Sequence, residues 1–554
     1  MAACNSTYYT DFTEGTVMMR ITNGMMTSNT KNNININKLN EDRLNTQIAT
    51  GQVISRPSED PVVAIRALRL NTNLSQLTQY YKKNIPDAEA WMNVTETALK
   101  QTNQIFTNIK ENLTTGASDD NTANDRQKIL ESLKGLRAEL YSAGNADYAE
   151  RTVFTGYRTG ESLTFLATDK DLNWNYNIHE TFDVNSLETF NYVTCGTKNV
   201  APPTDPENYQ TDEKYVEREP ISRIRLAYDT LKTLANGTIK LTAGEGTSAE
   251  TGYIDYKTKP IAGLSQAKID EIYTNIPDGE AVFIPETGEL LLSKGAAAKY
   301  TKFFSDYADK SPAPSASFEY DKDQWHSGDL RPEHYFACVQ TDEDDKKTYY
   351  NYDPKLDDSE KPLVPTEPDP SKPHFVNQDL EVEISFNQKI TINTHANEVY
   401  THDIGRDVDE LLAATQATVD ADEKRSTLKK ALSSMTEGTT EYEETQKKLA
   451  AAEKEFSFRK DKMQKLFSAG LDTFAGYADR NDVAIANIGS MQSRLSITKE
   501  RVADQLQSFK ELADKNINAE LTESSIDFSN AKLALEAAQL AAGKISQQTL
   551  LNYL

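Results

Sequence analysis

The sequence predicts an α+β protein with helices at both ends of the chain and a β-rich segment between them. In the first and last parts of the 554 residues, apolar side chains recur with alternating three- and four-residue spacing, which is typical of a helical seam. In the middle the spacing changes to period two, which indicates strands, and most of the prolines lie there. We therefore expect an elongated molecule in which the terminal helices form a coiled-coil rod bundle around an inserted central β-rich domain.

The N-terminal helical half is expected to span residues 19–157. Its seam starts near Val63 and continues to Leu113. Pro86 lies inside this pattern and removes one backbone hydrogen bond, so we expect a kink or a short break near Ile85. The stretch LTTGASDDNTAND, which starts at Leu113, is rich in turn residues and predicts a loop. A further helix should follow, with one apolar face formed by Ile129, Leu133, Leu136 and Leu140.

A helix-break motif interrupts this half in ATGQVISRPSEDPVVAIRAL, which runs from residue 49 to residue 68. Gly51 can end a first helix in the left-handed conformation, and Pro57 prevents that helix from continuing. Ser58 or Asp60 can cap a second helix through its side-chain oxygen. Pro61 then falls in the first turn of the second helix, where its missing N–H costs nothing. The motif therefore predicts two helices joined by a short connection.

The middle of the chain, residues 158–406, predicts the central β-rich domain. Within it, EAVFIPETGELLLS places Pro285 and Gly288 between two apolar runs, which suits a hairpin turn. LEVEISFNQKITIN alternates apolar and polar residues and predicts one long strand, or two strands joined by a short loop. Helical spacing then returns, and TEGTT separates the two helices of a hairpin. We expect the hairpin and the returning helix to occupy 407–475 and the C-terminal helical half to occupy 476–554.

The C-terminal helix carries the most regular apolar seam, which we take as the candidate assembly seam. It runs unbroken through Ile517, Leu521, Phe528, Ala531, Leu535, Ala538, Ala542 and Ile545. Full burial of this seam contributes on the order of 10 kcal/mol, while ordering the backbone costs tens of kcal/mol, which helical hydrogen bonds only roughly offset. The helix is therefore marginal alone. Its partners are either helices of the same chain or other copies, and in the second case Ala538→Glu should block assembly.

Charge and hydropathy exclude several classes of partner. The net charge of −25, from 85 Asp and Glu against 60 Lys and Arg, repels nucleic acid and anionic membrane surfaces. No stretch has the roughly 18 consecutive apolar residues of a membrane span. The first 18 residues lack the basic and apolar regions of a signal peptide, so export would proceed without a cleaved signal.

Motifs for chemistry are also missing from the sequence. The three cysteines are far apart, and the six histidines lack the i, i+4 pairing of a helical zinc site. We therefore predict that the protein is not an enzyme and has no catalytic residues, cofactor or metal. The most distinctive stretch of the middle is GDLRPEHYF, from Gly328 to Phe336, where we expect a structural loop rather than a site.

Both ends of the chain resemble the flagellin superfamily, and most closely those members that join the flagellar hook to the filament. At the N-terminus the resemblance is carried by MRITNGMM, QIATGQVISRPSEDPVVA, NIPDAEAWMNVTETALKQTNQI and AERTVFTGYRTGESLTF. At the C-terminus it is carried by IGSMQSRLSITKERV and LTESSIDFSNAKLALEAAQLAAGKISQQTLLNYL. The resemblance covers about half of the chain. Residues 1–18 precede the start of the family, and they are either a disordered extension or a misassigned start.

The resemblance implies a structural role in the flagellum, outside the cell, as a hook–filament junction adaptor. By the resemblance, the terminal helices pair in the inner tube of the flagellar axis and stay largely unfolded until assembly. The implied partners are other copies of this chain in one layer of that tube, the other junction protein, flagellin and an export chaperone. Two alternatives stay open: a filament flagellin, which shares the helical ends, and a surface-displayed enzyme or glycan binder in the central domain.

Overall fold

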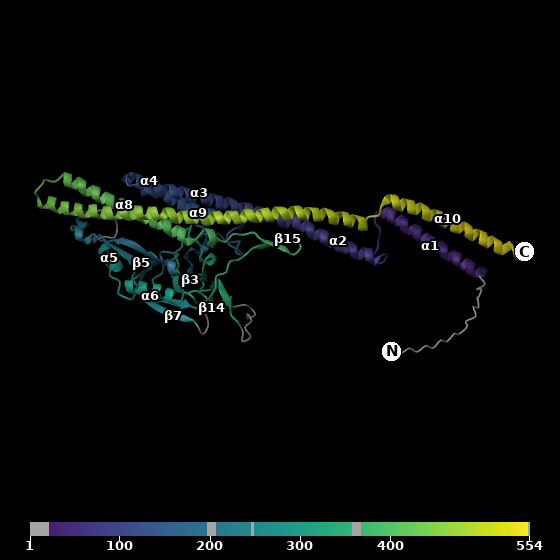
Figure 1. The fold of residues 1–554 in the computed structure, drawn as a ribbon, viewed down its shortest axis with the longest axis horizontal. Helices are drawn as coiled ribbons and strands as arrows, with labels where there is room; N and C mark the ends of the chain where they lie inside the picture. Colours follow the sequence, from purple (N-terminus) through teal and green to yellow (C-terminus); the bar gives the residue numbers. More distant parts are fainter. Residues whose placement is uncertain (1–21, 197–205, 245–248, 357–366, 552–554) are drawn as a thin grey trace, which may run out of the picture. The chain divides into compact units, whose positions relative to one another are not determined.

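The computed structural model of the protein describes residues 22–196, 206–244, 249–356 and 367–551 (Figure 1). The predicted extension at residues 1–18 lies outside the described residues. The chain forms two compact units, one made of residues 1–84 and 497–554 and the other of residues 85–496. Helices dominate both ends and strands dominate the middle, so the predicted α+β class is confirmed.

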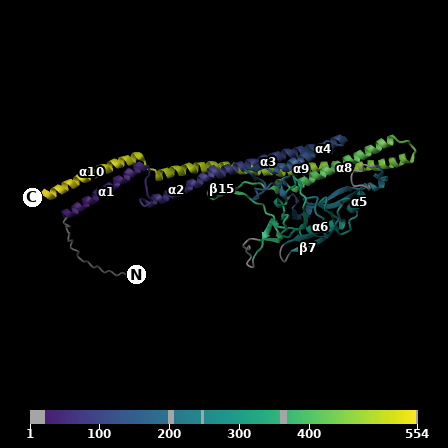
Figure 2. The same ribbon diagram turned by 180° about the vertical axis from the view of Figure 1, so that it is seen from behind.

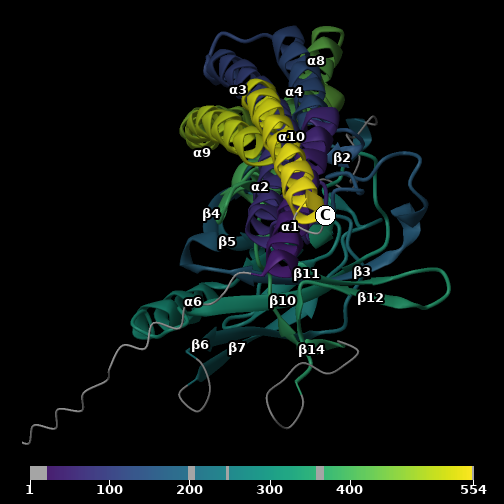
Figure 3. The same ribbon diagram turned by 90° about the vertical axis from the view of Figure 1, so that its right-hand side faces the viewer.

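The α-helices described in the first unit are α1 (Asn23–Thr50), α2 (Pro61–Gln79), the end of α9 (Thr440–Ile517) and α10 (Leu521–Leu551). Helices α1 and α10 lie side by side (Figure 1, Figure 3). The Asn37 side chain donates a hydrogen bond to the carbonyl of Ala534 at 3.4 Å. Because Gln52 also forms an antiparallel bridge with Asn518, the two helices run in opposite directions.

The second unit contains a helical bundle and a β-sheet domain. The bundle consists of α3 (Ile85–Ala117), α4 (Ala123–Gly144), α8 (His402–Ser433) and the part of α9 up to residue 496, which Figure 2 shows from behind. In its core the ring of Phe106 meets Phe474 edge-on, with centroids 6.4 Å apart. The hydroxyls of Thr102 and Tyr400 share a buried hydrogen bond of 2.7 Å. The short helix α7 (Ala396–Val399), which precedes Tyr400, thus ties the end of the central domain to α3.

Two features of α3 differ from the sequence prediction. A π-helical turn over Tyr80–Asn84 precedes it, at the place where Pro86 predicted a kink or break. A π-helical turn is a short stretch with i→i+5 hydrogen bonds inside an otherwise continuous helix. At its other end, α3 continues to Ala117 instead of giving way to a loop at Leu113. Leu113 is fully buried, so tertiary packing outweighs the turn-forming composition of this stretch.

Helix α9 is longer than the sequence analysis indicated. It runs without interruption for 78 residues, so the predicted boundary between 475 and 476 falls inside it. The predicted hairpin is present, because α8 ends at Ser433 and α9 begins at Thr440 after the TEGTT turn. Leu428 of α8 and Ala452 of α9 pack together with Tyr209 in a small buried cluster.

The central domain is built on a ten-stranded sheet with the order β12-β11-β3-β10-β6-β7-β8-β9-β5-β4. All neighbours are antiparallel except β7 and β8, which are parallel. The strands of this sheet are β3 (Asn175–Phe182), β4 (Leu187–Val193), β5 (Arg218–Arg225), β6 (Gly237–Ala243), β7 (Glu250–Thr258), β8 (Ala281–Ile284), β9 (Glu289–Leu292), β10 (Ser315–Lys322), β11 (Ala337–Thr341) and β12 (Lys347–Tyr350). Three two-stranded pairs accompany it, formed by β1 (Asp147–Tyr148) with β2 (Arg151–Thr152), β13 (Tyr352–Pro354) with β14 (Pro368–Pro373), and β15 (Glu381–Ser385) with β16 (Gln388–Thr391).

Helices cover both faces of this sheet at its centre. One apolar cluster includes Phe283 of β8 and Tyr300 of α6 (Lys294–Asp306). A second cluster includes Val282 of β8 and Ile272 of α5 (Gln266–Thr274). Because consecutive residues of β8 point to opposite faces, α5 and α6 cover opposite faces. This explains why β8 and β9 are buried along their whole length rather than at alternate positions.

The predicted hairpin at residues 280–293 is present, and the structure decides between the two alternatives for residues 380–393. Strands β8 and β9 pair antiparallel across the turn that contains Pro285 and Gly288. The stretch from residue 380 to 393 forms two strands, β15 and β16, rather than one long strand. The turn between them contains Asn387, whose φ of 54° lies in the left-handed region that asparagine tolerates.

Candidate functional site

The helix break between α1 and α2 is formed by capping residues. Gly51 ends α1 with φ of 70°, and its N–H donates to the carbonyl of Gln47 at 2.8 Å. Of the two capping candidates, the structure selects Asp60, whose carboxylate accepts hydrogen bonds from the N–H groups of residues 62 and 63 at 2.9 and 3.1 Å. Pro61 is the first residue of α2, while Pro57 and Ser58 lie in the preceding turn.

A second break, between α9 and α10, lies against the first. The Val53 N–H donates to the carbonyl of Ile517 at 2.8 Å, and the Ala519 N–H donates to the carbonyl of Gly51 at 2.9 Å. The two connections therefore form a short antiparallel bridge that registers α1 against α10. The expectation of an unbroken C-terminal seam from Ile517 was wrong in this respect, because Ile517 ends α9 and α10 begins at Leu521.

Most residues of the predicted assembly seam lie on the face of α10 that packs against α1 in the same chain. Ala531 and Leu535 are buried, and the partly buried positions are Phe528, Ala538 and Ala542. Leu521 is 56% exposed, and the side chain of Ile545 lies outside the described residues. The seam therefore serves first as an intramolecular contact. This contact buries few side chains. Among the described residues of α1 and α10, the buried ones are Leu44, Ser524, Ala531 and Leu535.

A different apolar stripe faces outward on α10, and the sequence analysis missed it. It consists of Ile526, Leu533 and Leu540, which are 58, 64 and 71% exposed. These residues are seven apart, so they share one face of the helix. Leu533 and Leu535 are two residues apart and thus about 200° apart around the helix axis, which places the stripe opposite the buried seam. We call these three residues the outer stripe.

Helix α1 also carries exposed apolar side chains. Helix α2, on the other side of the break, carries exposed apolar side chains as well. Met25, Ile36 and Leu39 of α1 are 50, 62 and 70% exposed. The spacing of eleven and three residues puts them on one face of the helix. Exposed apolar side chains that share one helix face are available for contact with another helix. The α1–α10 pair therefore has uncovered apolar surface on both of its helices.

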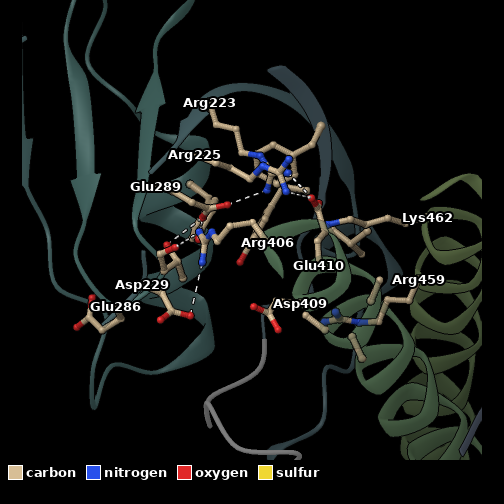
Figure 4. A pocket seen from close by; sticks show the side chains of 18 of the residues that line it. Arg223, Arg225, Asp229, Glu286, Glu289, Arg406, Asp409, Glu410, Arg459 and Lys462 are labelled. Atoms are coloured by element: carbon tan, nitrogen blue, oxygen red, sulfur yellow. Dashed lines mark hydrogen bonds and ion pairs between the residues drawn. The ribbon is translucent and has the colours of Figure 1, made fainter. Parts of the chain in front are cut away.

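A cleft lies in the second unit, between the central sheet and helices α8 and α9 (Figure 4). Its volume is about 460 Å³. Arg223 and Arg225 reach it from β5, because residues i and i+2 of a strand point to the same face. Glu410 of α8 and Lys462 of α9 reach it from the opposite side (Figure 4).

Ion pairs across this cleft connect the sheet to the bundle. Arg223 contacts Glu410 at 2.5 Å and Glu289 at 2.8 Å, and Arg225 contacts Asp407 at 2.6 Å. Burial raises the pKa of Glu410, but the attraction of Arg223 and Arg225 outweighs it, so this pKa lies below its usual value. Burial dominates at Asp407, whose pKa is raised. The arrangement holds fixed charges in place and thereby orients the central domain on the bundle.

The lining of this cleft combines arginine and lysine side chains with carboxylates. None of the described residues that line it is a histidine, cysteine or serine. His402, which lies outside the cleft lining, has carboxylate neighbours, with Nε2 3.4 Å from Asp403 and 4.0 Å from Glu180. The thiols of Cys195 and Cys338 are buried, and burial raises the pKa of both. Among the described helices, none combines the length and the apolarity needed to cross a membrane.

Known proteins share the helical N-terminal part of this chain. The profile of the bacterial flagellin N-terminal helical region matches residues 21–159, which include α1, α2, α3, α4 and both sides of the helix break. Residues 21–159 are a flagellin N-terminal helical region. The predicted resemblance to the flagellin superfamily is thereby confirmed.

Within the flagellin superfamily, the curated relatives are flagellar hook-associated proteins. Flagellar hook-associated protein 3 of Salmonella typhimurium is 27% identical over 142 residues, which are 26% of this chain and 44% of the relative. The same protein of Escherichia coli is 28% identical over 114 residues, which are 20% of this chain and 36% of the relative. The chain thus spans less than half the length of the curated relatives that it matches.

Solved structures of flagellar proteins are also similar to this chain. A putative flagellar hook-associated protein from Vibrio parahaemolyticus has 10% identity and a TM-score of 0.31, and the match covers 83% of this chain and 100% of that chain. Flagellar hook-associated protein 3 from Legionella pneumophila has 8% identity and a TM-score of 0.25, with 80 and 97% covered.

Proposed function

We propose that this protein is a structural adaptor of the bacterial flagellum that joins the hook side to the flagellin filament. The observation that carries the proposal is the outer stripe on a helix pair of a flagellin type. The pair buries few residues within its own chain and leaves Ile526, Leu533 and Leu540 more than half exposed. Covering such a face requires neighbouring helices, and adjacent copies in a tube supply them. The relatives named flagellar hook-associated protein 3 favour the junction as the place of assembly.

The proposal gives each unit its own task. The α1–α10 pair and the helix break make the contacts between copies, and with the other junction protein and flagellin on either side. The central domain is held on the bundle by the Arg223 and Arg225 ion pairs, so it is displayed rather than used in assembly. In this scheme the protein is exported without a cleaved signal, with help from a chaperone, and acts outside the cell. No reaction is assigned to it.

Immunogold labelling of flagella tests the proposal directly. An antibody against the central domain should label one short zone between hook and filament. Labelling along the whole filament would instead support a filament flagellin, and labelling of the cell body alone would overturn the flagellar role. As a second measurement, purified protein added to filament seeds should stop growth after a short segment, whereas sustained growth into long filaments would contradict the adaptor role.

A further inference from the structure

Three side chains that could hold a metal ion converge at the edge of the central domain. Glu161, Glu333 and His334 each offer one ligand atom, and these atoms all lie within 4.8 Å of one another. Glu333 and His334 belong to a 3₁₀ turn, Pro332–His334, within the stretch GDLRPEHYF. Glu161 comes from the loop that follows β2, far away in sequence. The two segments are held together by Arg158, which donates to the Glu333 carbonyl at 2.6 Å.

The buried carboxylate of Glu333 indicates that this cluster can bind a ligand. Its side chain is 1% exposed, and its Oε2 atom has no hydrogen-bond partner among the described residues. Its other oxygen, Oε1, lies 3.4 Å from the Arg331 guanidinium. Leaving a buried carboxylate oxygen unpaired costs free energy that proteins normally avoid. A bound cation would satisfy that oxygen.

His334 is oriented as a metal-ligating histidine usually is. Its Nε2 lies 3.2 Å from the carbonyl oxygen of Ser162. Because a carbonyl only accepts hydrogen bonds, Nε2 carries the proton and the lone pair is on Nδ1. A backbone carbonyl that fixes the tautomer in this way is the common outer partner of a metal-bound imidazole. His334 is also buried, so its ring is held rigidly.

The charge balance also favours a divalent cation. Arg331 is already paired with Asp169 at 2.7 Å and Asp171 at 2.6 Å. With Arg158, two arginines therefore face four carboxylates, namely Asp169, Asp171, Glu161 and Glu333. Glu333 and His334, together with Arg158, also line a cavity of about 20 Å³ beside the cluster, which has room for a single water molecule.

We propose that Glu161, Glu333 and His334 bind a divalent transition-metal ion, of which zinc is the best fit. Imidazole with carboxylates suits zinc and its neighbours, whereas magnesium and calcium prefer oxygen ligands alone. Zinc bonds of about 2.0–2.1 Å place tetrahedral ligands about 3.3 Å apart, so the ligands must draw closer than the upper limit seen here. The exposed Glu161 can make that movement, and water completes the coordination. The ion clamps the β2 loop to the GDLRPEHYF loop, independently of assembly.

Titration of the full-length protein tests the site. Metal is removed with a chelator, and ZnCl₂ is then added in a calorimeter, with MgCl₂ as a parallel probe. We expect one equivalent of zinc per chain and no magnesium binding. Glu161→Gln should weaken zinc binding at least tenfold without changing the circular dichroism spectrum, because Glu161 is exposed. Glu333→Gln should do the same.

His326→Ala is the matched control, since His326 is exposed and lies 3.8 Å from Asp329 outside the cluster. It should change the zinc affinity less than twofold. The proposal is overturned if the wild-type protein binds no zinc, or if Glu161→Gln binds zinc as tightly as the wild type. If Glu333→Gln does not fold, the Glu161→Gln result alone decides.

Discussion

The outer stripe makes a sharp prediction at Leu533. Its three members are 58, 64 and 71% exposed, so burying them between copies contributes about 1–2 kcal/mol each, or about 3–6 kcal/mol per copy. Leu533→Glu removes one of these contributions and also places a carboxylate in a contact that excludes water, which is costly unless the charge is paired. Within the single chain the same substitution is a surface change, expected to alter stability by no more than about 0.5 kcal/mol.

The assay replaces the wild-type protein with Leu533→Glu in cells and measures motility, junction labelling and thermal unfolding of the purified monomer. We expect loss of motility and labelling with an unchanged melting temperature. Gln539→Glu is the control, because it adds the same charge to an exposed position of α10 that lies away from the stripe. Normal motility and labelling of the Leu533→Glu cells would refute the reasoning. Ala538→Glu is a poorer probe than the sequence suggested, since Ala538 faces α1 and its substitution also disturbs the pair within the chain.

Three further predictions concern folding. Asp60→Ala should destabilise the protein by about 1 kcal/mol through loss of the α2 cap, measured by urea unfolding, while Ser58→Ala should have no effect because the structure gives the cap to Asp60. Glu410→Gln should cost about 1–3 kcal/mol at neutral pH. The pKa of Glu410 is lowered from its usual 4.5, so its contribution to the free energy of unfolding is complete above that value. This contribution is lost as the pH falls through the folded-state pKa. The difference in stability between Glu410→Gln and the wild type should therefore shrink in acid. Gly116→Ala should cost about 1–3 kcal/mol by overpacking, since a methyl group there overlaps the buried ring of Phe467, and an unchanged melting temperature would contradict the packing.

Local chemistry made the helix break predictable. Gly51, Asp60 and Pro61 act through their own backbone conformation or through N–H groups two or three residues away, so the sequence alone contains the information. The same holds for the β8–β9 hairpin, whose turn residues lie between its strands. The continuous apolar runs of β8 and β9 agree with burial on both faces. The strand sequences do not say which elements cover those faces, and the structure shows that they are α5 and α6.

The direction in which each helix face points was not predictable in the same way. The seam through Leu535 and the outer stripe through Leu533 are both regular, and periodicity alone does not say which one packs inside the chain. That choice depends on α1. The side of α1 that faces α10 is largely polar, so its hydrophobic periodicity is weak. The metal-ligand cluster was missed for a related reason. Spacing rules find ligands on one helix or in one short loop, whereas Glu161 and Glu333 meet only because two distant loops pack together.

The weak α1–α10 contact and the strong cleft contacts suggest a division of stability that suits an adaptor. The buried Arg223 and the partly buried Arg225 each pair with several carboxylates, and breaking such a pair leaves an uncompensated charge, so the central domain stays fixed on the bundle. The α1–α10 pair has no comparable network among its described residues and is registered mainly by the hydrogen bonds between its two breaks. The α1–α10 pair is therefore held by fewer contacts than the central domain. In the proposed adaptor, neighbouring copies would cover the outer stripe and stabilise this pair, and the central domain would not need to change.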